Sequence, residues 1–275
     1  MQWWQKVATG AIHTEAAVRL DLNSDVGESF GVWTTGNDEA LMPYLTSASI
    51  ACGWHGGDPR VMRQSIRLAK AHDVKVGAHP GLPDLIGFGR RSMQLSPEEA
   101  RDYLVYQVGA LRAFVQAEGM HLQHVKPHGA FYHMAAHNRH LSEAISQAVA
   151  EVDPALILIG PPDSELVKAG QAAGLRVARE GFGDRAYNED GSLVSRSVPG
   201  ALLTDPNAVA DQVLMMAEGK VRAITGRMIP IAVDTVCLHG DTPGAPAIAK
   251  RLRERLASAG VQTMALEELL VGQVS

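Results

Sequence analysis

The stretch SASIACGWHGG, residues 47–57, is small and apolar in its first half and carries an aromatic residue, a histidine and two glycines in its second half. A short, continuous apolar run is typical of a strand that is buried on both faces, as in a parallel sheet. Such a strand brings His55 to its carboxyl end. The neighbouring glycines let a backbone or a ligand come close to the histidine.

Three later stretches repeat this arrangement. They are KVGAHPG with His79, HVKPHGAFY with His128, and TVCLHGD with His239. In parallel sheets, ligands bind outside the carboxyl ends of the strands, where residues distant in sequence converge. A single histidine after a strand is more often a packing or hydrogen-bonding residue. Four of them, each next to glycine or proline, predict a shared functional rim.

The rest of the chain alternates strand-like and helix-like stretches. We predict strands that begin near residues 18, 47, 75, 124, 155, 176 and 235. Helices lie between them, and one is expected to run from the fourth strand to about Val152. Seven strands that alternate with helices imply a parallel sheet, and short strands favour a closed or nearly closed barrel. The sequence therefore predicts an α/β fold with one seven-stranded (β/α) barrel domain at residues 18–275. Residues 1–17 are predicted to be an N-terminal extension, because their apolar residues follow neither the helical nor the strand period.

Further polar residues lie at the predicted strand ends. Asp21, Asn23 and Asp25 alternate along the first strand and share one face, with Asp25 nearest the exit. For Asp21 and Asn23, a structural role is at least as well supported as a catalytic one. Asp25 and Glu28 are better functional candidates, because they lie at the strand exit. Lys126 lies two residues before a histidine, where a lysine can recognise an anion or stabilise developing negative charge.

Two predicted loops add charged residues. The loop after the third strand ends in Arg90 and Arg91, which could close over a negatively charged ligand, although paired arginines are usually part of a solvated face. The loop after the sixth strand offers Glu180, Asp184 and Arg185.

The composition excludes several classes of function. The 275 residues carry a formal net charge of -5, so no basic footprint for nucleic acid or an anionic membrane is present. No apolar run reaches the length of a membrane span, and the first residues lack the features of a signal peptide. Cys52 and Cys237 lie in apolar runs, where cysteine behaves as a small buried hydrophobe. We expect a cytoplasmic protein with a small-molecule substrate.

The rim residues leave two mechanisms open. No strand end delivers a serine or cysteine beside a base, and no phosphate-binding loop of the Walker or Rossmann kind is present. Either histidines and a carboxylate hold a metal that activates water, or an aspartate or histidine acts as general base without a metal. The spacing of the histidines does not decide between them.

Seven motifs together resemble the LamB/YcsF, or lactam-utilisation, family, whose members are 5-oxoprolinase A subunits. They are DLNSDVGE, ACGWHGGDP, GAHPG, HVKPHGAFY, FGDRAYNEDGSLVSRS, PGALL and TVCLHGD, in this order from about Leu20 to the final helix. Residues 1–17 have no counterpart in the family. The resemblance implies a distorted seven-stranded barrel of the glycoside hydrolase/deacetylase type.

The resemblance also implies a reaction, the ATP-dependent opening of the lactam of 5-oxo-L-proline (pyroglutamate) to L-glutamate with two partner subunits. Because this chain shows no nucleotide-binding loop, a partner that activates the amide oxygen by phosphorylation would bind most of the ATP. This chain would then add water and open the ring. The resemblance leaves open whether the reaction uses a divalent metal.

The position of each residue on its strand suggests a role in that reaction. Asp25 or His55 is the hypothetical base for the attacking water, and His79, His128 and His239 are ligands or proton carriers. If a metal is bound, His55, His79 and His128 are its expected ligands.

Three further residues complete this hypothesis. Lys126 and Arg185 would hold the substrate carboxylate or the phosphoryl oxygens, and Asp184 would orient Arg185. One alternative function is a stand-alone metal-dependent deacetylase or amide hydrolase that acts on sugars, active without partners. Another is a non-catalytic scaffold, for which rim substitutions would not affect turnover; the polar residues that converge at the strand ends argue against it.

Overall fold

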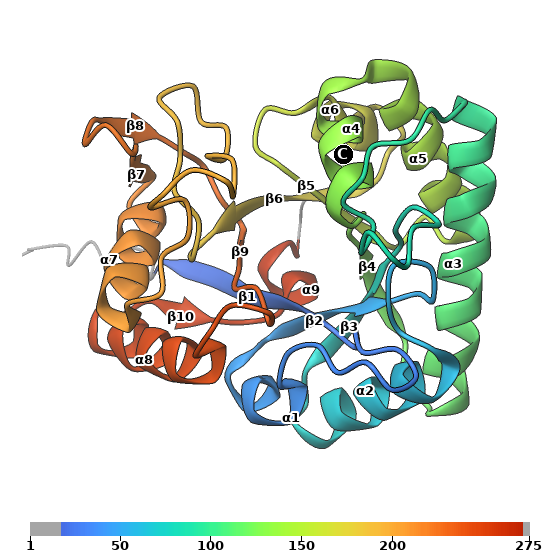
Figure 1. The fold of residues 1–275 in the computed structure, drawn as a ribbon, viewed down its shortest axis with the longest axis horizontal. Helices are drawn as coiled ribbons and strands as arrows, with labels where there is room; N and C mark the ends of the chain where they lie inside the picture. The colour runs from blue at the N-terminus through green and yellow to red at the C-terminus, as the bar shows by residue number, and fades with distance from the viewer. Residues whose placement is uncertain (1–17, 272–275) are drawn as a thin grey trace, which may run out of the picture.

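The computed structural model describes residues 18–271, so the predicted extension at residues 1–17 lies outside the described part of the chain. Figure 1 shows most of the strands in the middle of the molecule and most of the helices around them. The strands of the central sheet are β1 (Arg19–Val26), β2 (Ser47–Ala51), β3 (Lys75–His79), β4 (Leu122–Val125), β5 (Ile157–Gly160), β6 (Arg176–Phe182) and β9 (Thr235–Cys237).

The helices mostly alternate with these strands. They are α1 (Asp38–Leu41), a 3-10 turn (Met42–Tyr44), α2 (Pro59–Ala71), α3 (Pro97–Ala117), α4 (Gly129–His137), α5 (Arg139–Val152), α6 (Glu165–Ala172), α7 (Pro206–Ala217), α8 (Ala245–Ser258) and α9 (Leu266–Leu269). Three short strands complete the described chain, an antiparallel pair of β7 (Lys220–Arg222) and β8 (Met228–Pro230), and β10 (Gln262–Thr263), which lies parallel to the start of β1.

The central sheet is a closed barrel of seven parallel strands. Each strand pairs in parallel with the next, from β1 through β6 to β9, and β9 pairs with β1 to close the ring. In this closure Asn23 on β1 lies opposite Ser47 on one side and Cys237 on the other. The predicted seven-stranded barrel is confirmed, and because all seven strands are parallel, their carboxyl ends meet at one rim.

Local sequence signals explain where the longest helix begins and which face it buries. The hydroxyl of Ser96 accepts a hydrogen bond from the backbone N–H of Glu99, whose carboxylate accepts one from Ser96 N in return, a capping box that fixes the start of α3. Its apolar stripe, which includes Leu104 and Leu111, is fully buried, and α3 packs on α5.

The prediction of one helix from the fourth strand to Val152 is wrong. The chain forms two helices, α4 and α5, separated at Asn138, which has extended backbone angles. Its side-chain oxygen accepts a hydrogen bond from Leu141 N and thereby caps α5.

The interior of the barrel is polar below the rim. The buried carboxylate of Asp21 accepts hydrogen bonds from the hydroxyls of Thr46, Ser47 and Thr235 at 2.7, 2.6 and 2.5 Å. Burial raises the pKa of Asp21 to about 6, although these hydroxyls lower it in part. No helix within residues 18–271 is both long and apolar enough to cross a membrane.

Candidate functional site

A cavity of about 340 Å³ opens at the carboxyl ends of the barrel strands. Six of the eight residues predicted for the site line it, namely Asp25, His79, Lys126, His128, Arg185 and His239. The other two lie behind lining residues. His55 stacks on His128 with ring centroids 3.6 Å apart, and Asp184 hydrogen-bonds to His239.

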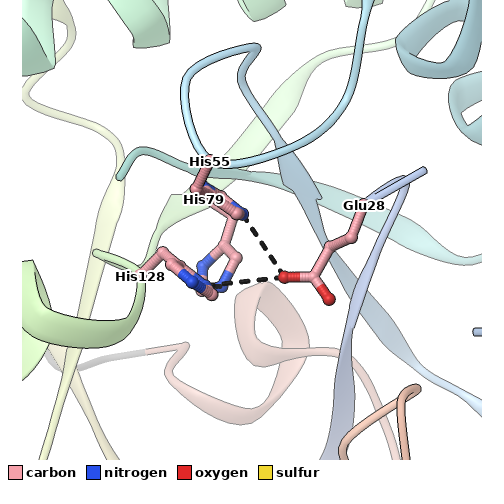
Figure 2. Close-up of side chains that lie close together, drawn as sticks. All are labelled: Glu28, His55, His79 and His128. Carbon is pink, nitrogen blue, oxygen red and sulfur yellow. Dashed lines mark hydrogen bonds and ion pairs between the residues drawn. The ribbon is translucent and has the colours of Figure 1, made fainter. Parts of the chain in front are cut away.

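Four residues at the ends of the first four strands form what we call the histidine cluster: Glu28, His55, His79 and His128. All four are buried, and one oxygen or nitrogen of each lies within 4.8 Å of those of the others. Figure 2 shows the carboxylate of Glu28 pointing toward the imidazole rings, with Oε1 3.3 Å from His55 Nε2 and 3.5 Å from His128 Nδ1. Three of the four predicted strand-end histidines therefore converge.

Glycine makes this close packing possible. A Cβ atom at Gly81, two residues after His79, would lie 2.4 Å from Nδ1 of His55, which is a severe overlap. Only glycine lets the loop after β3 approach the ring of His55. This agrees with the expectation that glycines beside the histidines allow close approach.

Burial and neighbouring charges set the protonation of the histidine cluster. Burial, with a smaller contribution from the charge of Asp25, raises the pKa of Glu28 to about 7. Burial lowers the pKa of His55 and of His128 well below the usual value, because the charged imidazolium is poorly solvated there. Neutral imidazoles beside a carboxylate are the ligand types that a divalent transition metal prefers.

Next to it lies what we call the lysine cluster: Asn23, Asp25, Lys126, Glu180 and Cys237. The buried ammonium of Lys126 lies 2.5 Å from Asp25 Oδ1 and 2.9 Å from both Glu180 Oε1 and Asn23 Oδ1, with Cys237 Sγ at 3.4 Å. Burial opposes the charge of Lys126, yet Asp25 and its other neighbours raise the pKa well above its usual value. Burial likewise opposes the charge of Asp25, but His79 and Lys126 hold its pKa well below the usual range.

These contacts differ from the role that the sequence suggested for Lys126. The ammonium donates hydrogen bonds to Asn23 Oδ1, Glu180 Oε1 and Cys237 Sγ and forms an ion pair with Asp25, so its three N–H bonds are already used within the chain. In this structure Lys126 neutralises the buried carboxylates of Asp25 and Glu180.

The structure adds Tyr132 and a role for Glu180 to the site. The hydroxyl of Tyr132 donates to Glu180 Oε2 at 2.8 Å, and both residues line the cavity. Two sequence signals point to them: Glu180 is an ionisable residue inside a buried strand, and Tyr132 follows His128 by four residues, one turn along α4.

A second pair of residues lies on the other side of the cavity. Asp184 Oδ1 lies 2.8 Å from His239 Nδ1, and Thr242 donates to Asp184 Oδ2 at 2.6 Å. Burial opposes protonation of His239, but Asp184 outweighs it and raises the pKa of the imidazole. Asp184 therefore orients His239 and not Arg185, since within residues 18–271 no hydrogen bond joins the two neighbours.

Three arginines give the mouth of the cavity a positive rim. Arg185 is buried, donates from one terminal nitrogen to Val194 O at 2.7 Å, and has an Nε without a hydrogen-bonding partner among the described residues. Arg90 and Arg196 both lie near Asp241, at 2.8 and 3.5 Å. Since one carboxylate does not neutralise three guanidinium groups, this rim suits an anionic group on a ligand.

Comparison with known proteins identifies relatives of this chain. The family model described as LamB/YcsF family matches residues 20–271. A curated protein of Bacillus subtilis (strain 168), named as the A subunit of 5-oxoprolinase, is 53% identical over 251 residues, which covers 91% of this chain and 98% of that protein. The protein of the same name from Pyrococcus furiosus is 51% identical and covers 92% of this chain and all of the relative.

A solved structure shares the fold. The crystal structure of the lactam utilization protein from Thermus thermophilus superposes with a TM-score of 0.86 at 48% identity, over 90% of this chain and 100% of that chain. A putative cellobiose-phosphate cleavage protein from Enterococcus faecalis V583 has a TM-score of 0.54 at 12% identity, which shows a related fold only.

Proposed function

The chain belongs to the LamB/YcsF family, and from this we propose that it is one subunit of an ATP-dependent 5-oxoprolinase. In this proposal the complex opens the lactam of 5-oxo-L-proline to L-glutamate, and this chain performs the ring-opening hydrolysis. The observation that carries the proposal is the identity of 53% and 51% to two relatives named as 5-oxoprolinase A subunits, over more than nine-tenths of the chain. A cavity of about 340 Å³ with acid, base and cationic residues supports it.

Asp25 is the better of the two candidate bases. It lines the cavity, whereas His55 lies behind His128. Lys126 and His79 keep Asp25 ionised at neutral pH, so its carboxylate accepts a hydrogen bond from the attacking water. Asp25 takes the proton of that water as the new C–O bond forms, and His79 Nε2, 3.3 Å from Asp25 Oδ2, keeps the carboxylate in place beside the cavity.

His239 is the candidate acid for the lactam nitrogen. When water has added to the ring carbonyl, the C–N bond breaks and the nitrogen leaves as an amine, which needs a proton. The raised pKa of His239, caused by Asp184, keeps the imidazole protonated nearer to neutral pH. The contact of ring atom Nδ1 with Asp184 Oδ1 at 2.8 Å holds the imidazole in one orientation, and His239 lines the cavity.

Arg185 is the candidate partner for the substrate carboxylate. It lines the cavity, is buried and has an unpartnered Nε among the described residues, while the ammonium of Lys126 is already saturated. A guanidinium is well suited to this task because its planar N–H groups match the two oxygens of a carboxylate. ATP is assigned to the partner subunits, since the sequence of this chain contains no phosphate-binding loop.

Glutamate release from 5-oxoproline tests the proposal. The purified chain, its two presumed partner subunits and the three-component mixture are each assayed with and without ATP. Glutamate is expected only from the complete mixture with ATP. Release by the two partners alone, or no release from any mixture, would contradict the proposal.

The stand-alone hydrolase is the second candidate function, and one observation favours it. The histidine cluster offers three imidazoles and a carboxylate, the ligand types of metal-dependent hydrolases. This function predicts release of acetate from N-acetylated sugars by the isolated chain with added Zn²⁺, in the absence of ATP and partners. The 5-oxoprolinase proposal predicts no such release.

A further inference from the structure

We propose that the histidine cluster is a binding site for one divalent transition-metal cation, with the carboxylate of Glu28 and the three imidazoles as ligands. The proposal goes beyond the proposed function, whose proton transfers are written without a metal. It is carried by hydrogen-bond geometry, by buried atoms without partners and by interatomic distances.

Two ring nitrogens without hydrogens face each other in the histidine cluster. His79 Nδ1 lies 2.7 Å from the carbonyl oxygen of Lys126, and His128 Nε2 lies 2.8 Å from that of Phe88. A carbonyl oxygen only accepts hydrogen bonds, so both of these nitrogens carry the hydrogen of the neutral ring. The other nitrogens, His79 Nε2 and His128 Nδ1, then present lone pairs to each other at 2.9 Å. A cation or a shared proton is needed to relieve that repulsion.

The other two residues of the histidine cluster have buried atoms without hydrogen-bonding partners among the described residues. Both ring nitrogens of His55 and Oε1 of Glu28 are buried and form no hydrogen bond with any described residue. Buried polar atoms are nearly always hydrogen-bonded or bound to an ion or water. One shared proton between His79 and His128 leaves these atoms unsatisfied, whereas one cation at the centre of the cluster satisfies an atom of each residue.

Three distances between ligand atoms of the histidine cluster match those around a single ion. With metal–ligand bonds of about 2.0–2.1 Å, two ligands of a tetrahedral ion lie about 3.3 Å apart. The atom pairs in the cluster lie at 2.9 Å for His79 to His128, 3.3 Å for His55 to Glu28 and 3.5 Å for His128 to Glu28. These three separations match the spacing of ligands around one ion, and the ring of His55, which is stacked parallel to that of His128, has to rotate to point its nitrogen at the same centre. Three of the four residues line the cavity that we assign to the substrate.

The adjoining lysine cluster limits the site to one ion. Asp25, Cys237 and His239 also come close enough to hold a metal. The ammonium of Lys126, however, already lies 2.5 Å from Asp25 and 3.4 Å from Cys237 Sγ. A second cation there would be repelled by the lysine, so Lys126 occupies the place of a second metal.

The ligand types define the class of cation. Three imidazoles and one carboxylate suit Zn²⁺, Co²⁺, Ni²⁺ or Fe²⁺, whereas Mg²⁺ and Ca²⁺ prefer oxygen ligands. One carboxylate and three neutral rings leave a divalent ion with one net positive charge, which the nearby carboxylate of Asp25 offsets, with Oδ2 3.3 Å from His79 Nε2.

Titration of the chelator-treated full chain with Co²⁺, followed by the visible absorption of the bound ion, tests this site without ATP, substrate or partners. One equivalent is expected to bind, displaced by Zn²⁺ but not by millimolar Mg²⁺. Glu28→Gln, which keeps the side-chain size, and His55→Ala are each expected to weaken Co²⁺ binding by about 100-fold or more. His133→Ala removes another histidine from the same cavity and is the matched control, expected to bind as the unmodified chain does.

Binding that is absent, or that His133→Ala and Glu28→Gln weaken equally, would overturn the proposal. Binding of two equivalents would contradict the place given to Lys126. Circular dichroism checks that each variant is folded. If His55→Ala does not fold, the Co²⁺ affinity of Glu28→Gln alone tests the site. Because only the metal is measured, the result is independent of the outcome of the glutamate assay.

Discussion

The histidine cluster and the lysine cluster lie side by side at the same rim and differ in how their polar atoms are satisfied. In the lysine cluster, three oxygens surround an ammonium that the chain itself supplies. In the histidine cluster, the ligand atoms converge on one another, and some have no hydrogen-bonding partner among the described residues. The difference teaches that the chain itself supplies the cation that satisfies the lysine cluster, whereas we propose that the histidine cluster obtains its cation by binding one.

The largest expected effect is on stability, from Lys126→Met. This variant keeps much of the side-chain volume but leaves the carboxylates of Asp25 and Glu180 buried without a counter-charge. We expect the free energy of unfolding to fall by about 3–5 kcal/mol in urea titrations at neutral pH. Lys168→Met, which removes the exposed ion pair with Glu165, is the control and is expected to cost less than about 1 kcal/mol. Equal effects of the two variants would refute the structural role of Lys126.

Asp184→Asn tests whether the pair with His239 supplies the acid. Because Asp184 raises the pKa of His239, its loss lowers that pKa and the protonated fraction near neutral pH. The alkaline limb of the pH profile of kcat/KM is expected to move to lower pH, with about a 100-fold loss at pH 8. Measurement of glutamate release across pH in the complete mixture checks this. A uniform loss at every pH would indicate a merely structural role.

Asp21 extends the comparison to a carboxylate that has hydroxyl partners but no cation. Its pKa of about 6 in the folded protein exceeds the ordinary value of 3.8. The folded state therefore binds more protons than the unfolded state between pH 4 and 6, and this contribution to stability is lost as the pH rises through 6. Asp21→Asn removes this pH dependence. When the pH is raised from 4 to 7.5, we therefore expect the free energy of unfolding of the variant to increase by about 2–3 kcal/mol relative to that of the unmodified chain.

Urea titrations of both proteins at the two pH values measure that gain. All other groups titrate alike in the two proteins and cancel in the difference. A difference in unfolding free energy that is the same at pH 4 and 7.5 would show that Asp21 has an ordinary pKa.

A smaller effect on stability than for Lys126→Met is expected from His128→Ala in the histidine cluster. The neutral ring of His128 contacts Phe88 O and His79, and its removal leaves no unpaired charge. We expect a cost of about 2 kcal/mol in the same urea assay, clearly below that of Lys126→Met. A larger cost than for Lys126→Met would reverse the comparison between the two clusters.

Much of this arrangement could be predicted because it depends on local patterns. Short apolar runs placed the seven barrel strands, and the rule that ligands bind at strand ends brought His55, His79 and His128 together. The break at Asn138 was missed because asparagine is compatible with both a helix and a cap. The β7–β8 hairpin was also missed.

The partners of charged residues could not be predicted, because they depend on contacts across the barrel. Glu180 lies 54 residues from Lys126 in sequence, yet it neutralises that ammonium. For the same reason Asp184 was assigned to its neighbour Arg185, whereas it bonds to His239, 55 residues away. Sequence spacing indicates which groups reach the rim, and only the fold decides how they pair.

The central claim is that this chain opens the lactam ring, and Asp25→Asn in the complete mixture of three subunits tests it most directly. Glutamate release and ATP hydrolysis are measured together, and gel filtration confirms that the variant assembles as the unmodified chain does. The account predicts that glutamate release falls by at least about 100-fold in an intact complex, while the exposed control Asp211→Asn releases glutamate at the unmodified rate. Glutamate release by Asp25→Asn at the rate of the unmodified chain would contradict the claim.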